Sequence, residues 1–517
     1  MHDSKVVGNI FNIRDFGAVA DKKTLATSAI QAAVDAAYAA GGGTAYCPPG
    51  SYLTGSVEIK SNVTLHLEAG ATLWGSTQRA DYRTLLLAVP PNFASYGPEH
   101  LIFAHNAENI AITGRGTIEG QGEAFWNPPA PGQRKWTTKD WRPVQLIAFS
   151  ECRNVLIEGV TIRNTPGYAI WPLGCDNVRI HGIRIFNHPF GPNTDGIDPD
   201  CCRGVIISDC HVEAGDDCIA IKSNGDKLGA GPGERPCEDV TVTNCTLVTK
   251  CCAIRIGYEG DQPIRNCTFS NLVIPRTRTG INMLVPRHEE VNILHGPQIE
   301  NISFSNIVMD TKIAFFLWVG DEAAAPGGIR NISISNVRAT TERGCYFGGS
   351  RTIPIENIRL SDIDLTVRGP MDDKFVASVP YPYHVFDYWG KWLGIPHGIY
   401  CRYVRGMDLS RVRVRWGDVS GQWRSALRCE QVEDFGIDGF VASQAPGANA
   451  SAIHLTDASG VFVRGCRAES GTGTFLSVDG AGSRRISVIG NDLAAAVTPM
   501  KSADGVCEGT LTGSSNG

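Results

Sequence analysis

The sequence lacks any apolar run that approaches the roughly 18 residues needed to cross a bilayer. It also lacks a basic excess, because 47 lysines and arginines stand against 53 acidic residues and leave a formal net charge of −6. Without a broad basic face, neither nucleic acid nor a membrane is expected as a partner. Assembly into an oligomer stays open.

A secretory leader is lacking too, since residues 1–12 do not contain a basic segment followed by an apolar one. Seventeen cysteines are present, an odd number, and several are adjacent, as in Cys201–Cys202 and Cys251–Cys252. In the absence of a leader we expect buried free thiols and a cytoplasmic location. A leader removed from the sequence would instead place the protein in the periplasm or outside the cell.

What the sequence does contain is glycine, at 58 residues, with 42% hydrophobic and 19% charged residues. This composition is typical of a folded protein with many strands and tight turns. A short pattern recurs: Asn or Gly, alternating branched apolar and polar residues, a turn residue, and a second short strand. Copies begin at or near Asn62, Asn109, Asn154, Asn177, Gly204, Asp239, Ile264, Asn301, Asn331, Asn357, Met407, Asp434, Gly460 and Arg485.

Neighbouring copies lie one coil apart, since the starts at Asn154, Asn177 and Gly204 are separated by 23 and 27 residues. Each copy is too short to fold alone and must stack on its neighbours, about 4.8 Å away. Asn at the turns suits left-handed backbone and side-chain ladders, and the recurring sequons are interpreted in this way. A propeller, with repeats of about 40 residues, and a sandwich fit less well. We therefore predict an all-β, single-stranded, right-handed parallel β-helix.

The N-terminal region departs from the repeated pattern. A strand and turn over residues 11–21 precede a predicted helix at about 24–40, which would cover the open end of the solenoid. We predict one domain, with this cap over residues 10–50, coils over residues 51–500, and a short tail after them.

Five inserts interrupt the coils and carry many of the aromatic residues. Inserts on a solenoid cluster on one face and form its cleft, where aromatic rings suit the apolar faces of sugars. The alternative is that the rings bury the undersides of the loops. The inserts span residues 88–99, 126–143, 224–236, 277–298 and 371–399.

Two acidic segments, NTDGIDPD and AGDDCIAIKS, carry the sharpest signal. Asp195 precedes Asp216 by 21 residues and Asp217 by 22, about one coil, so the three acids should share one face. Close carboxylates repel, so at least one pKa should rise, and glycosidic cleavage requires a protonated acid beside ionised carboxylates. Turn capping and a calcium site are the alternatives. Asp198 and Asp200 are assigned to the capping class.

With FNIRDFGAVAD and LIFAHNAENIAITGRGTIEGQG, these segments make the chain resemble glycoside hydrolase family 28, the polygalacturonase and rhamnogalacturonase family, over most of residues 10–270. The resemblance implies a pectin-lyase-like β-helix that hydrolyses pectin-type polysaccharides or oligosaccharides with inversion, without metal or cofactor. It implies that Asp216 protonates the leaving glycosidic oxygen. It further implies that Asp195 and Asp217 activate the attacking water and that Asn193 helps to position them.

Two signatures of that family are missing. In place of its Gly-His-Gly stretch the chain reads KCCAIRIGYEG, with Cys252 where the histidine would lie. In place of its Arg-Ile-Lys stretch it reads RTGINML, with Asn282 and Leu284 where a basic pair would grip the sugar carboxylate. Either another arginine replaces that pair, or the sugar is neutral or deoxy, such as rhamnose. The arginines considered are Arg255, Arg276, Arg278 and Arg287.

Further residues complete the predicted binding set. Tyr258 and Glu259 would bind sugar hydroxyls, whereas His384 and His397, in the last insert, either line the cleft or stiffen the loop. The absent leader and the large loops favour exo action on imported oligosaccharides. The predicted substrate-binding residues are Asn193, Lys222, Arg255, Tyr258, Glu259, Asn282, Arg287 and His397.

Two other functions stay open. A β-helix polysaccharide lyase would need a calcium-bridged uronate and a basic proton abstractor, and the sequence offers the acids without an obvious basic partner beside them. A non-catalytic carbohydrate-binding solenoid is the other alternative, and the two missing signatures favour it.

Overall fold

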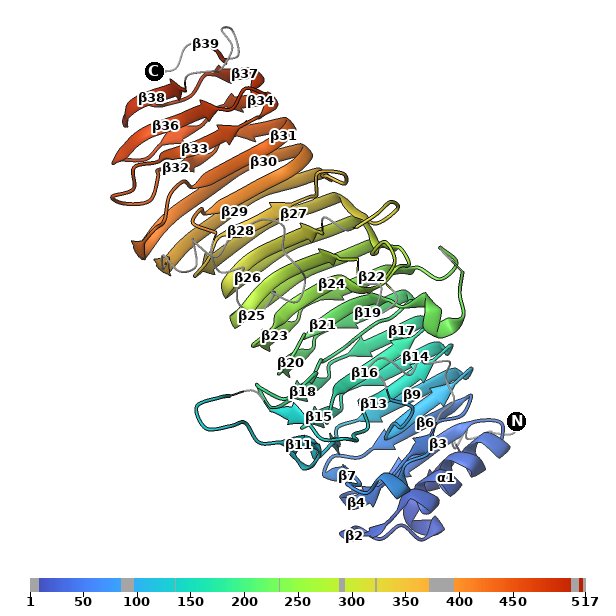
Figure 1. Ribbon diagram of the computed structural model, residues 1–517. Helices are drawn as coiled ribbons and strands as arrows, with labels where there is room; N and C mark the ends of the chain where they lie inside the picture. The colour runs from blue at the N-terminus through green and yellow to red at the C-terminus, as the bar shows by residue number, and fades with distance from the viewer. Residues whose placement is uncertain are drawn as a thin grey trace, which may run out of the picture. The chain divides into compact units, whose positions relative to one another are not determined.

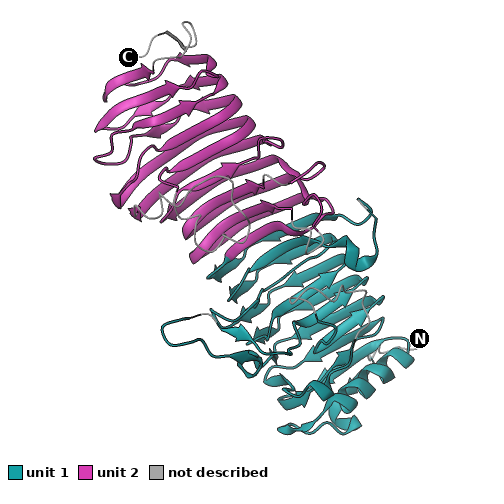
Figure 2. Ribbon diagram, viewed as in Figure 1, with its two compact units in different colours: residues 1–251 teal, residues 252–517 magenta. Residues whose placement is uncertain are grey.

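The computed structural model describes residues 9–84, 97–134, 136–231, 233–287, 293–320, 323–371, 395–503 and 511–514. The chain divides into two compact units, unit 1 at residues 1–251 and unit 2 at residues 252–517 (Figure 2). Each unit is a stack of parallel strands, and each is described below by itself (Figure 1).

Unit 1 winds through three parallel columns of strands, because one short strand enters each column in every coil. The first column is β1 (Ile10–Asn12), β3 (Gly43–Cys47), β6 (Val63–Leu67), β9 (Glu108–Gly114), β14 (Arg153–Glu158), β17 (Asp176–His181), β19 (Arg203–Ser208) and β22 (Cys237–Thr243). The second is β2 (Asp21–Leu25), β4 (Gly50–Thr54), β7 (Ala71–Gly75), β10 (Thr117–Glu119), β15 (Thr161–Arg163), β18 (Arg184–Phe186), β20 (His211–Ala214) and β23 (Thr246–Thr249). The third is β5 (Val57–Glu58), β8 (Ile102–His105), β13 (Gln145–Ser150), β16 (Tyr168–Leu173) and β21 (Ile219–Ser223).

The third column carries the coil that matters most for the site. Between β16 and β21 the chain contributes two isolated parallel bridges in place of a full strand. Ile197 pairs with Ile170 on one side and with Ile219 on the other, and Asp200 pairs with Leu173 and Lys222. The segment around Asp195 is therefore held in register with both neighbouring strands.

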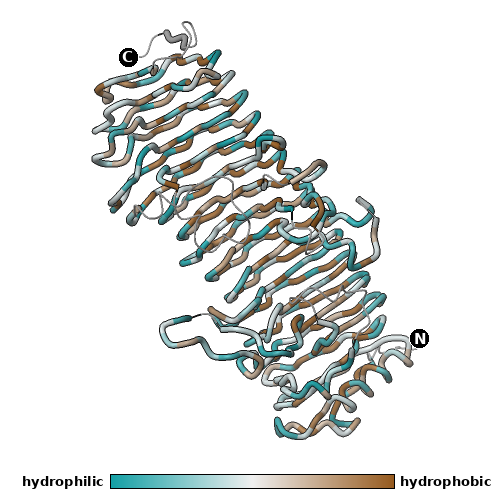
Figure 3. The backbone as a smooth tube through the Cα atoms, viewed as in Figure 1, coloured by the Kyte–Doolittle hydropathy of each residue, from teal (hydrophilic) through white to brown (hydrophobic). Residues whose placement is uncertain are grey.

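The alternating pattern produces these strands, because inward positions are buried and outward positions are not. The strands β6 and β7 alternate strictly between buried and partly exposed residues, and Figure 3 shows the same alternation of hydropathy along the coils. At the turns, Asn62, Asn109, Asn154 and Asn177 have φ between 54° and 63°. Their amides form a ladder, with Nδ2···Oδ1 distances of 2.9, 3.0 and 3.2 Å between successive coils. The interpretation of these asparagines as turn and ladder residues is confirmed.

One helix covers the N-terminal end of unit 1. It is α1 (Thr27–Ala39), slightly shorter than predicted, and it lies against β1, β3, β5 and β6. Figure 1 shows the helix beside β3. The strands β1 and β2 precede the helix and already pair with β3 and β4, so the coils begin before residue 51. The buried residues of the helix are Ala29, Ile30, Ala33, Val34 and Ala37.

Unit 2 continues the parallel stacking with longer strands that bend at turns. Two amide ladders run through it, one joining Asn266, Asn301, Asn331 and Asn357 and one joining Asn271, Asn306 and Asn336. Its strands are β24 (Cys252–Gly260), β25 (Ile264–Val285), β26 (Gln298–Val319), β27 (Gly328–Thr341), β28 (Cys345–Gly348), β29 (Ile355–Met371), β30 (Ile399–Gly421), β31 (Leu427–Asp438), β32 (Val441–Ala442), β33 (Ser451–Thr456), β34 (Ser459–Arg464), β35 (Arg467–Ala468), β36 (Thr472–Asp479), β37 (Arg484–Ile489), β38 (Ala496–Ser502) and β39 (Leu511–Ser514).

The sixteen cysteines within the described residues are all buried thiols, with no disulfide among them, as expected from the sequence. The seventeenth, Cys507, lies outside the described residues. Within the described part of the chain, no helix is long and apolar enough to cross a membrane.

Candidate active site

Three carboxylates meet on the third column of unit 1. Asp195 and Asp217 each lie two residues before a partner of the Ile197–Ile219 bridge, so they occupy one row on neighbouring strands. The backbone fixes this register, since the Gly196 N–H donates to the Asp217 carbonyl at 2.8 Å. One carboxylate oxygen from each of Asp195, Asp216 and Asp217 lies within 4.8 Å of the other two. The one-coil spacing predicted from the sequence therefore brings the three acids together.

The turn that precedes the paired acids is held by Thr194. The Gly215 N–H donates to the Thr194 hydroxyl at 3.1 Å and to its carbonyl at 3.3 Å. A Cβ on Gly215 would lie 2.4 Å from both the Thr194 hydroxyl and the His188 carbonyl oxygen, so only glycine fits. From the next coil, the Thr249 hydroxyl donates to the Asp216 carbonyl. These contacts fix the backbone of Asp216 from two sides.

A buried guanidinium holds the other acidic segment. Arg142, 5% exposed, donates to the carbonyls of Pro166 at 2.8 Å and Pro192, and to the Asn193 side-chain oxygen at 2.8 Å. Asn193 has φ 50°, a left-handed conformation that asparagine tolerates. Burial lowers the pKa of Arg142 to about 10, so it stays charged near neutrality. The sequence placed Arg142 in an insert but gave no reason to single it out.

The electrostatics of the cluster centre on Asp195, which is 4% exposed. Burial raises the pKa of Asp195 well above its ordinary value, and the nearby charges of Asp198, Asp216 and Asp217 raise it further. The ammonium of Lys222 opposes this shift. Asp216 is the more exposed member of the cluster, whereas Asp195 and Asp217 are buried. One of the three acids thus has the raised pKa that the clustering predicts.

Lys222 lies behind the carboxylates. Its side chain is 2% exposed, and its Nζ lies 3.0 Å from Asp198 Oδ2, 3.8 Å from Asp195 Oδ2 and 3.9 Å from the centre of the Tyr168 ring. The ammonium of Lys222 balances the charge of the cluster, and the prediction that Lys222 binds substrate stays a prediction. Asp198, predicted to cap a turn, pairs with Lys222.

Asp200 does act as the predicted cap. Its Oδ1 accepts from the Asn224 N–H at 2.7 Å, and its Oδ2 accepts from the Asn224 side chain at 3.0 Å and the Trp171 indole at 3.3 Å. Asp200 is therefore confirmed as a cap, whereas Asp198 forms an ion pair with Lys222 and its predicted capping role stays a prediction. Asp198 and Asp200 lie two residues apart in one segment, and this spacing does not show which carboxylate caps a turn and which pairs with a buried lysine.

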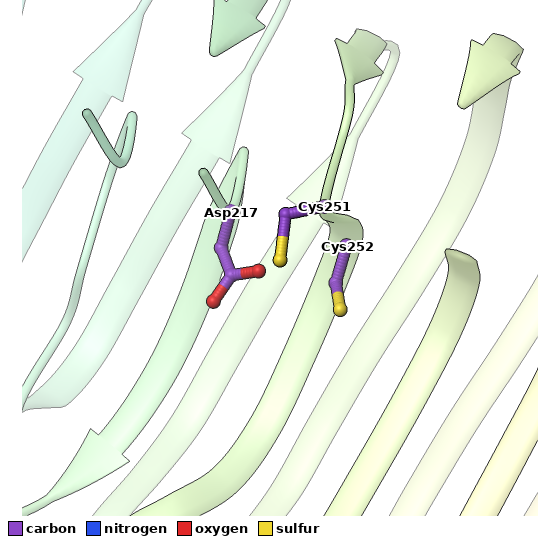
Figure 4. Close-up of side chains that lie close together, drawn as sticks. All are labelled: Asp217, Cys251 and Cys252. Carbon is purple, nitrogen blue, oxygen red and sulfur yellow. The ribbon is translucent and has the colours of Figure 1, made fainter. Parts of the chain in front are cut away.

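The close oxygens of the three acids could also coordinate a cation. Asp217 contributes to a second possible ligand group, since its carboxylate lies within 4.8 Å of the Cys251 thiol (Figure 4). Against a divalent ion, the Lys222 ammonium already lies 3.8 Å from Asp195 and supplies positive charge there. The prediction that the site works without a metal stays a prediction.

The other predicted binding residues belong to unit 2. Arg255, 8% exposed, lies on β24 in register with Asn282 on β25, and its guanidinium carbon is 5.2 Å from the centre of the Tyr258 ring. Glu259 is partly exposed at the end of β24, and Arg287 is exposed just after β25. Four of these residues therefore lie on the first two strands of unit 2, and Arg287 follows the end of the second strand.

His397 lies elsewhere in unit 2, just before β30. It is 9% exposed, its Nδ1 accepts from the Ser425 N–H at 3.4 Å, and its ring packs 5.8 Å from that of Tyr400. His384, the other histidine of that insert, lies outside the described residues.

Comparisons with protein families, curated proteins and solved structures found several similarities to this chain. The model of the family "Glycosyl hydrolases family 28" matches residues 48–380. A "Probable polygalacturonase" of Vitis vinifera is 33% identical over 318 residues, which cover 59% of this chain and 61% of that protein. The crystal structure of an exopolygalacturonase from Thermotoga maritima is similar with a TM-score of 0.60 and 25% identity, over 70% of this chain and 87% of that one. The family 28 exopolygalacturonase of Yersinia enterocolitica has a TM-score of 0.55 at 21% identity, over 73% and 77% of the two chains.

Proposed function

Because the chain belongs to glycosyl hydrolases family 28, we propose that it hydrolyses glycosidic bonds of pectin-type polysaccharides or the oligosaccharides derived from them. The observation that carries the proposal is the cluster of Asp195, Asp216 and Asp217, whose oxygens lie within 4.8 Å of one another. Hydrolysis of this bond requires one carboxylic acid and at least one carboxylate near the scissile bond. The similar proteins named polygalacturonases support the substrate class.

We assign the roles by exposure as well as by resemblance. Asp216, the most exposed of the three, protonates the leaving oxygen, because the acid must reach the bond that breaks. Asp195 and Asp217, on one row, hold the attacking water between them. Asp195 must be ionised for this role, whereas burial and the neighbouring carboxylates raise its pKa and favour its protonated form; the Lys222 ammonium opposes that shift and so supports the ionised state.

The reaction inverts the anomeric centre in this proposal. General spacing arguments do not favour inversion here, since inverting pairs lie roughly 6.5–9.5 Å apart and retaining pairs about 5–5.5 Å apart. The nearest oxygens of this cluster lie within 4.8 Å of one another. Inversion therefore rests on a different arrangement, in which Asp195 and Asp217 hold one water between them and Asp216 acts as the acid. In this arrangement the acid and the base need not lie far apart.

The test combines stereochemistry with a variant. Proton NMR during cleavage of an oligogalacturonide or a rhamnogalacturonan fragment should show the inverted anomer first. Asp216→Asn should lower kcat by about 10²- to 10⁴-fold, the usual contribution of a general acid. Glu158→Gln, an exposed carboxylate at the end of β14, makes the same chemical change outside the site and should leave kcat unchanged. A retained anomer first, or full activity in Asp216→Asn, would refute the proposed mechanism.

Exo action is part of the proposal, supported by the exopolygalacturonase of Thermotoga maritima at 25% identity. An exo enzyme releases one small product from the start of the reaction, whereas an endo enzyme lowers the viscosity of the polymer first. Product sizes at low conversion therefore separate the two.

A calcium-dependent lyase is the competing function, because the three oxygens could also bind a cation. Its nearest basic residue, Lys222, is paired with Asp198 at 3.0 Å and is 2% exposed, which is a poor position for a proton abstractor. Unsaturated products that disappear on adding a chelator would favour the lyase over the hydrolase.

A further inference from the structure

Unit 2 contains a cavity of about 850 Å³ outside the residues that match the family. Its lining brings together the side chains of Arg424, Arg428 and Lys501 with those of two histidines, His397 and His454. No aspartate or glutamate is among the described residues that line it. The cavity therefore carries the positive charge of three basic side chains, while two carboxylates lie behind its lining, Glu430 at 3.7 Å from Arg428 Nη2 and Asp479 at 2.8 Å from His454 Nε2.

Strand register builds one wall of this cavity. Arg428 on β31 pairs with His454 on β33, His454 pairs with Ser477 on β36, and Ser477 pairs with Lys501 on β38. Residues paired in parallel strands point to the same side at intervals of about 4.8 Å. The four side chains thus form a row about 14 Å long, three such intervals, on one face of the sheet.

Several donors in the cavity lack partners within the protein. The Arg428 Nη1 is buried and makes no hydrogen bond to the described residues, while its Nη2 lies 3.7 Å from Glu430 Oε2. The Ser425 hydroxyl, in a residue 1% exposed, also makes none among them. Burying a donor without an acceptor is unfavourable, so both groups are suited to donate to a bound ligand.

His397 adds to the donor character, whereas the Nε2 of His454 already pairs with Asp479 at 2.8 Å. The Ser425 N–H donates to Nδ1 of His397, so the neutral ring carries its proton on Nε2 and can donate from there. Burial, with Arg428, Arg424 and His454 around it, holds the pKa of His397 well below its ordinary value. An anion in the cavity would be attracted by the same charges that disfavour protonation of His397.

The cavity also has the features of a sugar site. Its volume lies within the roughly 300–1,000 Å³ of small-molecule pockets and exceeds what a lone inorganic anion needs. Hydroxyl and amide groups line it, with Ser451 Oγ and Ser477 Oγ 2.6 Å apart and Asn449 and Thr474 nearby in the lining. The indole of Trp423 also lines it and is anchored by its Nε1–H, which donates to the Gly369 carbonyl at 2.9 Å. Trp423 is 3% exposed and shapes the wall, so the polar lining is the feature that suits the hydroxyls of a carbohydrate.

We infer that this cavity of unit 2 is a binding site for an acidic oligosaccharide, with Arg424 and Arg428 receiving a sugar carboxylate. A planar guanidinium matches a carboxylate with two parallel hydrogen bonds, and the row from Arg428 to Lys501 offers room for more than one sugar. The choice of a sugar carboxylate over other anions rests on the proposed function. The site itself rests on the cavity and the row alone.

The test measures binding, not turnover. Full-length protein with Asp216→Asn is titrated by calorimetry with three probes: trigalacturonate, a neutral galactose trisaccharide, and inorganic sulfate. In this background, Arg428→Gln and Arg424→Gln should each weaken trigalacturonate binding about tenfold to a hundredfold, as loss of a charge-assisted hydrogen bond does. Arg424 and Lys501 are exposed, so their replacement leaves packing intact, and Lys501→Gln provides a third variant.

Arg338→Gln is the matched control, because Arg338 is an exposed arginine of β27 that does not line the cavity. It should bind trigalacturonate like the parent. Equal affinities for the parent and the three cavity variants would overturn the site. Sulfate binding as tight as that of trigalacturonate would overturn the sugar assignment. A protein that binds through Arg428 but shows no hydrolysis in its unmutated form would refute the proposed function and leave this inference standing.

Discussion

Arg142→Met tests whether the candidate site depends on one buried guanidinium. Arg142 joins three segments, since it donates to the carbonyls of Pro166 and Pro192 and to the side chain of Asn193, two residues before Asp195. Methionine preserves much of the apolar stem and removes all of the donors. Because Asp195 follows Asn193 so closely, any relaxation there moves a proposed water-binding carboxylate.

The expected loss of stability depends on the acceptors of Arg142 that have no second hydrogen-bond donor. The Pro166 carbonyl keeps a second donor, the Trp126 indole at 2.9 Å, so loss of its hydrogen bond from Arg142 costs little. Among the described residues, the Pro192 carbonyl and the Asn193 side-chain oxygen accept no second side-chain hydrogen bond, and hydrogen bonds to a charged group contribute about 1.5–3 kcal/mol each. Losing two such hydrogen bonds would lower the free energy of unfolding by about 3–6 kcal/mol. We expect the lower end, about 3 kcal/mol, because the lowered pKa of Arg142 indicates that the guanidinium itself is costly to bury.

The assays are urea unfolding at pH 7 and steady-state kinetics on the same preparations. Arg142→Met should lower the free energy of unfolding by about 3 kcal/mol and kcat by more than tenfold, with a smaller change in KM. Arg134→Met is the control, because Arg134 is an exposed arginine of the same insert. If both variants unfold at the same urea concentration and turn over alike, the positioning role of Arg142 is refuted.

Two further predictions concern the same coil. The pKa of Asp195 is raised in the folded state. The free energy of unfolding therefore falls as the pH rises from 3.8, the pKa in the unfolded chain, to the pKa in the folded protein. Asp195→Asn should therefore unfold at a higher temperature than the parent at pH 7, and the difference should vanish near pH 3.5; a constant difference across this range would contradict the shift. Gly215→Ala should cost about 1–3 kcal/mol of stability and reduce kcat, because its Cβ would lie 2.4 Å from two oxygens. Gly473→Ala, whose Cβ would have no atom closer than 3.9 Å, should do neither, and equal effects in the two variants would rule out the steric argument.

Repetition made the architecture predictable from the sequence. The predicted right-handed parallel β-helix is confirmed by the parallel pairing of every strand column and by the fold of the similar solved structures. Asn154 and Asn177 fall 23 residues apart because each begins a coil, and their side chains do form a ladder. The resemblance to family 28, built on motifs in the first half of the chain, is confirmed by the family match.

Other features depend on contacts that repetition does not encode. Arg142 lies in an insert without periodicity, so nothing in the sequence marks it as the partner of a segment 51 residues later. The pairing of Lys222 with Asp198 crosses between coils through the interior, where spacing along the chain does not reveal the side chain's direction. The unit 2 cavity combines residues from His397 to Lys501 through strand register, in coils where no chemical motif stands out.

The position of Arg255 bears on the sugar that the enzyme accepts. The sequence left two accounts of the missing basic pair, a relocated arginine or a neutral sugar. Asn282, at the place of the absent arginine, is in register with Arg255 on the neighbouring strand, so the two side chains share a face about one strand spacing apart. Arg255 therefore lies on the strand next to Asn282, the position where the resemblance places the family's arginine. Arg255 is 92% buried and stacked near Tyr258, which would strengthen its pairing with a carboxylate relative to an exposed arginine. We therefore propose Arg255 as the relocated guanidinium, and the choice between an acidic sugar and rhamnose stays a prediction, which comparison of Arg255→Gln with the parent on the two substrates would test.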